Sequence, residues 1–142
     1  MNTAALYDLA KQQNIEILRH PMPENGSMSV MLDNGACFIG MDDSVCDGSI
    51  QERVHLAHEL GHCATGSFYN IHAAVDCRER HENRATKWAI QNLIPIDALD
   101  QAIANGNTEI WQLADLFEVP EEFIRRAICY YTYGNVAAEL YF

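Results

Sequence analysis

The chain has few basic residues, no closely spaced cysteine pair and no long apolar run. Nine lysines and arginines stand against twenty aspartates and glutamates, which gives a net charge of −11 over 142 residues. Because such a chain repels phosphate backbones and offers no basic face, we expect it not to bind nucleic acid directly. No uninterrupted apolar stretch approaches the ~20 residues that a membrane span needs, so we expect no membrane partner.

Cysteines are scattered through the chain and none of them forms a CxxC pair. They are Cys37, Cys46, Cys63, Cys77 and Cys129. An odd count with irregular spacing fits a reduced protein better than a disulfide framework. The N-terminal segment also lacks the unbroken apolar stretch of a signal peptide. We therefore expect a soluble, cytoplasmic protein in which Cys63 is a buried thiol.

Length and composition fit one globular domain over residues 1–142. Apolar spacing and turn signals predict a helix at 3–13, strands at 15–18, 28–32 and 36–41, and helices at 50–64, 79–93, 97–104, 108–117 and 121–133. Asn34-Gly35 between two apolar runs predicts a hairpin. The order indicates an α+β fold, in which a small antiparallel sheet packs on a helical core. Residues from about 96 to 133 would form a small helical C-terminal subdomain.

The helix expected at 50–64 carries the HExxH pattern, His58-Glu59-Leu60-Gly61-His62. Residues four apart lie on one face of a helix, so both imidazoles can bind one metal ion. Glu59 lies one step round the helix, where its carboxylate can take a proton from a metal-bound water without binding the metal. The pattern therefore predicts a zinc (Zn²⁺) hydrolase with His58 and His62 as ligands and Glu59 as general base.

A catalytic zinc needs a third protein ligand and leaves one position open for water. The extended pattern HExxHxxGxxH is absent, because Thr65 and Phe68 occupy the positions that require glycine and histidine. We favour Glu82, because small residues at 85 and 89 continue its stripe and would let its helix pack against Gly61. The alternative third ligands are His72, Asp76, Glu79 and His81.

Three further roles stay open in the sequence. His55 lies on the same helix face as His58, where it either lines the cleft or belongs to plain helix surface. Four side chains qualify by type for stabilising an oxyanion: Tyr69, His72, Tyr130 and Tyr131. The strand expected at 36–41 is the candidate edge along which an extended peptide would bind.

Two segments resemble the ImmA/IrrE family of bacterial metallopeptidases. They are RVHLAHELGH at residues 53–62 and ExxAxxWAxxxLIP from Glu82 onward. Downstream, QLADLFEVP at residues 112–120 is similar to the LAxxFxVP segment of that family. The resemblance implies a zincin-like minimal metallopeptidase in which His58, His62 and Glu82 bind zinc and Glu59 is the general base. Trp88 stands where the family usually has phenylalanine, and His55 where it more often has threonine.

The resemblance also implies a partner. Families of this kind occur on phages, other mobile elements and stress-response loci, and they cleave a repressor with a helix-turn-helix domain. We therefore expect a zinc endopeptidase of narrow specificity that acts on such a repressor. The alternative is a module that binds the repressor without cutting it, although an intact Glu59 favours the enzyme. Residues 113–127 resemble a helix-turn-helix themselves, but their acidic side chains make direct contact with DNA costly.

Overall fold

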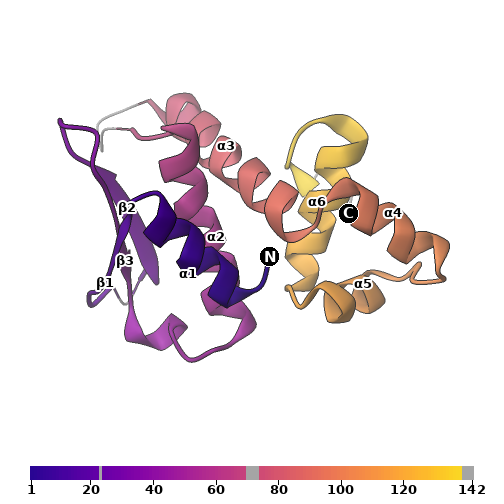
Figure 1. The fold of residues 1–142 in the computed structure, drawn as a ribbon. Helices are drawn as coiled ribbons and strands as arrows, with labels where there is room; N and C mark the ends of the chain where they lie inside the picture. Colours follow the sequence, from indigo (N-terminus) through magenta and orange to yellow (C-terminus); the bar gives the residue numbers. More distant parts are fainter. Residues whose placement is uncertain (23, 70–73, 139–142) are drawn as a thin grey trace. The chain divides into compact units, whose positions relative to one another are not determined.

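The structure, a computed structural model, describes all residues except 23, 70–73 and 139–142 (Figure 1). It divides into two compact units, residues 1–89 and 90–142. The described elements are α1 (Thr3–Gln12), β1 (Glu16–Arg19), β2 (Ser27–Met31), β3 (Cys37–Met41), a 3-10 turn η1 (Asp43–Val45), α2 (Ile50–Thr65), α3 (Val75–Leu93), α4 (Ile96–Ala104), α5 (Ile110–Phe117) and α6 (Glu121–Tyr133). Helices together with one small sheet give the α+β class that the sequence predicts.

The three strands of the first unit lie in the order β1-β3-β2. β2 and β3 form the predicted antiparallel hairpin, with Gly35 of its turn at φ +87°. β1 runs parallel to β3, so the prediction of a purely antiparallel sheet is wrong. After β1 the chain crosses to the opposite edge of the sheet and forms β2. The hairpin turn then places β3 between β1 and β2. The expectation that residues 36–41 form an edge is therefore also wrong, because β3 is central and β2 is an edge strand.

α1 and α2 cover one face of this sheet (Figure 1). The helix-facing residues of β3 alternate with the outward ones and are buried together with Leu6, Leu56 and Leu60 of the helices. α2 begins at Ser49, whose hydroxyl accepts the Gln51 N–H, and it ends at Gly66 in the left-handed conformation. The predicted bounds of this helix are thus confirmed. Residues 59–62 of the HExxH segment are buried in the first unit.

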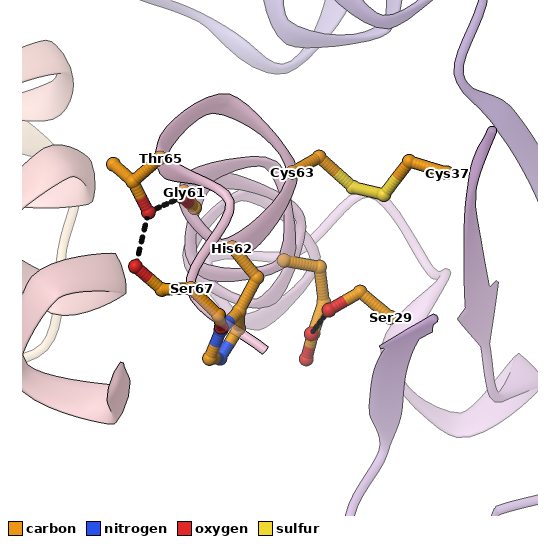
Figure 2. The surroundings of a disulfide bond; sticks show 8 residues. Ser29, Cys37, Gly61, His62, Cys63, Thr65 and Ser67 are labelled. Atoms are coloured by element: carbon orange, nitrogen blue, oxygen red, sulfur yellow. Dashed lines mark hydrogen bonds between the residues drawn. A yellow bond between two sulfur atoms is a disulfide. The ribbon is translucent and has the colours of Figure 1, made fainter. Parts of the chain in front are cut away.

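A disulfide joins Cys37 of β3 to Cys63 of α2, whose Cα atoms are 6.1 Å apart (Figure 2). The prediction that Cys63 is a thiol is therefore wrong. Cys63 does point away from the side of α2 that carries His62, as the helical spacing indicates. The side of α2 that carries Cys63 faces β3, where Cys37 is one of the buried residues. A chain separation of 26 residues hides this pairing from any local pattern.

Reducing this disulfide should lower the free energy of unfolding by about 3–4 kcal/mol, because the bond closes a loop of 26 residues in the unfolded chain. Urea denaturation with and without a reducing agent measures the loss. A double variant, Cys37→Ala with Cys63→Ala, is the control. It should unfold at the lower midpoint whether reductant is present or not. A midpoint that shifts equally in both proteins would contradict the prediction.

In the second unit, α5 and α6 bury a shared apolar contact. It contains Leu113, Ala114, Phe123, Ile124 and Ala127. The Tyr131 hydroxyl donates to the Ile94 carbonyl oxygen at 2.7 Å and so holds α6 to the segment before α4. The single domain expected over residues 1–142 and the helical subdomain expected at about 96–133 both stay predictions. In the described parts of both units, no helix is long and apolar enough to cross a membrane.

Candidate metal centre

The candidate metal centre lies where α2 and α3 approach each other closely, at Gly61. A Cβ atom on Gly61 would lie 2.5 Å from the Ala85 carbonyl oxygen and 3.0 Å from the Ala85 Cα. Ala85 and Ala89 of α3 are fully buried. The prediction that small residues bring these two helices together is confirmed. α3 begins at Val75, four residues before the predicted start.

His58 and His62 of α2 meet Glu82 of α3 at this approach. The Nε2 atom of His58 lies 2.8 Å from the Glu82 carboxylate, and the Nε2 atom of His62 lies 3.3 Å from it. The three ligand atoms all lie within 4.8 Å of one another. Tetrahedral ligands at zinc distances are about 3.3 Å apart, so the spacing of these two imidazoles and one carboxylate is of the size that one metal ion needs. These residues are placed to bind a metal.

Each imidazole is oriented by a contact on its Nδ1 atom. The Nδ1–H of His62 donates to the Ser67 carbonyl oxygen, which directs Nε2 toward Glu82 and the position that a metal ion would take. Ser67 lies in the turn after α2, where Thr65 Oγ1 bonds both its hydroxyl and the Gly61 carbonyl (Figure 2). On the other imidazole, His58 Nδ1 lies 3.4 Å from the Thr86 hydroxyl of α3. Thr65, which rules out the extended zinc pattern, thus helps to fix a ligand of the shorter one.

Charges within the group favour a bound cation. Burial opposes the ionised form of Glu82, but hydrogen bonds from the His58 and His62 imidazoles outweigh it and hold the pKa of Glu82 well below its usual range. Burial likewise lowers the pKa of His62, yet the Glu82 carboxylate and the Ser67 carbonyl raise it overall. Glu82 is therefore a carboxylate facing two imidazoles, and a metal ion would satisfy all three.

Tyr69 is the oxyanion candidate that lies beside the metal residues. Its hydroxyl donates to Glu82 Oε1 at 2.9 Å, and burial together with this carboxylate raises the pKa of the phenol. Its ring stacks on His81 at a centroid distance of 6.1 Å. Tyr130 and Tyr131 bond instead to Gln91 and Ile94 within the second unit. His72 and the side chain of Asp76 lie outside the described residues.

Glu59 has two partners that the sequence analysis missed. Its carboxylate is 6% exposed and accepts the Ser27 hydroxyl on Oε2 at 2.8 Å and the Ser29 hydroxyl on Oε1 at 2.9 Å. Both serines lie on the side of β2 that faces α2. The outward residues Met28 and Val30 are 46% and 41% exposed, so the polar and apolar faces of this strand are reversed. The alternation in SMSVM would place Met28 and Val30 in the core, so the sequence alone gives no signal for the two serines.

A profile of the IrrE N-terminal-like domain, Peptidase_M78, matches residues 10–128. The chain belongs to this family. The match spans all of α2 and α3, so it includes the three residues that are placed to bind a metal, and it confirms the resemblance to ImmA/IrrE proteins. Peptidase_M78 is a family of metallopeptidases. No curated protein and no solved structure matches the chain significantly.

Replacing Glu82 with alanine should weaken zinc binding by at least the ~10–100-fold that loss of an outer hydrogen-bonding partner costs, because the carboxylate is itself a ligand. Competition with a chromophoric chelator measures the affinity. Glu79→Ala, one turn earlier on an exposed part of α3, is the matched control and should bind zinc normally. Normal binding by Glu82→Ala together with lost binding by Glu79→Ala or His81→Ala would contradict this ligand set.

Proposed function

We propose that the protein is a zinc endopeptidase of narrow specificity that cleaves a helix-turn-helix transcriptional repressor. The observation that carries this proposal is the convergence of His58, His62 and Glu82, with Glu59 next to His58 on the same helix. Two imidazoles and one carboxylate are the ligand set of several catalytic zinc sites, which keep the fourth position open. A purely structural zinc site would instead be closed by four protein ligands.

A zinc ion held by His58, His62 and Glu82 would lower the pKa of a coordinated water to about 7 and would polarise the carbonyl of the scissile bond. Glu59 then takes a proton from the attacking water and passes it to the leaving amine. Tyr69 is the candidate donor to the oxyanion, because its hydroxyl already lies 2.9 Å from Glu82 Oε1. His62 and His58 hold their orientation through the bonds on their Nδ1 atoms.

β2 is the proposed peptide-binding strand, because among the described residues no strand pairs with its outer edge. The Leu32 N–H donates to Ala36 and the Asp42 N–H donates to Gly26, so even-numbered residues of β2 bond to β3. The backbone groups of Ser27, Ser29 and Met31 consequently face the open edge. An extended substrate would add there as a further strand, which fixes the peptide beside α2.

Charge and family support a repressor as the substrate. The net charge of −11 favours a partner with a basic surface, which is what a DNA-binding domain presents. Members of the ImmA/IrrE family that the chain resembles act on such repressors. The narrow specificity would come from this whole-surface attraction together with the short edge of β2.

The test is co-expression with a helix-turn-helix repressor encoded beside this protein, together with a reporter under that repressor. Repressor fragments detected by mass spectrometry and a rise in reporter output are expected. Both should disappear in a His62→Ala variant, and a zinc chelator should stop cleavage by the purified protein. Reporter output that rises without any fragment would favour the second candidate, a module that binds the repressor and relieves it without cutting.

A further inference from the structure

We propose that Ser27 and Ser29 are positioning residues for the general base Glu59. Their hydroxyls orient its carboxylate, while their backbone groups face the edge where the substrate strand would add. The inference rests on the proposed peptidase function. It assigns a role in turnover to β2 that goes beyond peptide binding.

The hydrogen bonds fix the carboxylate in one orientation. One serine bonds each oxygen of Glu59, at 2.8 and 2.9 Å, and Ser27 is 7% exposed. A carboxylate anchored on both oxygens cannot rotate about its terminal bond without breaking one of these bonds. Each carboxylate oxygen can accept two hydrogen bonds, so one acceptor position on each remains for the attacking water. The serines therefore hold the base without blocking it.

His55 extends this arrangement by one more group. Its Nδ1 atom lies 2.8 Å from Ser27 Oγ. The hydroxyl has a single proton, and it goes to the carboxylate, which has none to offer. His55 Nδ1 must then be the donor, and the lowered pKa of His55, caused by burial, agrees with a neutral ring. A Cβ on Gly26 would lie 3.0 Å from the imidazole, so Gly26 leaves room for His55 to reach Ser27.

β2 thereby links the substrate to the base. The residues whose hydroxyls hold Glu59 are the odd-numbered ones, whose backbone groups point to the open edge. A peptide paired with the Ser29 backbone would hold β2 in place and with it the hydroxyl that orients Glu59. Removing the hydroxyls should then slow turnover while leaving peptide binding intact, because the backbone remains.

Steady-state kinetics of the zinc-loaded protein test this. The probe is the quenched fluorescent peptide that the wild type cuts fastest in a pooled library. Ser27→Ala and Ser29→Ala should each lower kcat about tenfold, and the double variant about 100-fold, as loss of one or two bonds to a charged group predicts. KM should change less than about threefold. Ser27→Thr and Ser29→Thr keep the hydroxyl and should restore kcat.

Ser44→Ala is the matched control, because Ser44 also bonds a carboxylate, that of Asp42, but lies in the exposed turn η1. Bound zinc and thermal melting establish that each variant folds. If the buried Ser27→Ala does not fold, the half-buried Ser29→Ala decides alone. Serine variants that behave like Ser44→Ala, or that raise KM at unchanged kcat, overturn this inference only. Failure of the wild type to cut any peptide or repressor overturns the proposed function itself.

Discussion

Glu59→Gln should fold, bind one zinc ion per chain and still bind its partner, yet cleave it about 10²–10⁴-fold more slowly. Glutamine keeps the size of the side chain, but its amide cannot take a proton from water. The variant remains compatible with the fold because the Ser27 and Ser29 hydroxyls rotate, so one can donate to the amide oxygen while the other accepts from its NH₂ group. Fragment formation on gels gives the rate, and elemental analysis gives the zinc content.

Glu79→Gln removes the same charge from an exposed position of α3 and should cleave at the wild-type rate. This comparison separates the loss of a base from the loss of one negative charge on an acidic protein. Equal reporter relief by Glu59→Gln and by the wild type, with no fragment from either, would replace the peptidase with the binding module. Loss of zinc from Glu59→Gln would contradict its role as a residue that does not ligate the metal.

Gly61→Ala should destabilise the first unit and weaken the metal site at the same time. The new Cβ would meet the Ala85 carbonyl oxygen at 2.5 Å, and a backbone atom cannot rotate away as a side chain would. Overpacking of this kind costs about 1–3 kcal/mol, which outweighs the ~1 kcal/mol that alanine gains over glycine in a helix. Because α3 must move to relieve the contact, Glu82 would withdraw from the imidazoles and zinc affinity should fall about tenfold or more.

Urea denaturation and zinc competition measure the two effects of Gly61→Ala. Ala64→Gly, at an exposed position on the same helix, measures the propensity term alone and should leave zinc affinity unchanged. A Gly61→Ala protein that is more stable than the wild type would mean that helix propensity outweighs the contact with Ala85. The close approach of the two helices would then not be what sets the metal geometry.

The candidate metal site is the part of this molecule that the sequence predicts best. His58 and His62 lie four apart on one helix, and that local spacing already decides that both can reach one ion. Glu82 is predicted by the small residues at 85 and 89, which let its helix approach Gly61, and also by the family resemblance. The hairpin at Asn34-Gly35 was accessible for the same reason, because two turn residues determine it.

Features that depend on contacts between residues far apart in the sequence could not be predicted from local sequence patterns. The position of β3 between β1 and β2 is set by how the hairpin packs, and no local pattern encodes that order. The disulfide joins Cys37 to Cys63 only because β3 and α2 meet in the folded chain. Ser27 and Ser29 read as ordinary polar residues within an apolar run until the face of the strand is known.

The disulfide holds only one of the two helices that form the candidate metal site. Cys63 follows His62 directly, and its partner Cys37 is on β3, which pairs with the strand that supports Glu59. The disulfide therefore ties α2 covalently to the sheet. His58, Glu59 and His62 all lie on this tethered helix. α3 joins the site through contacts that are not covalent, at Gly61 and through Glu82. Local loss of packing at Gly61 would therefore separate Glu82 from the two imidazoles before it separated His58, Glu59 and His62 from one another.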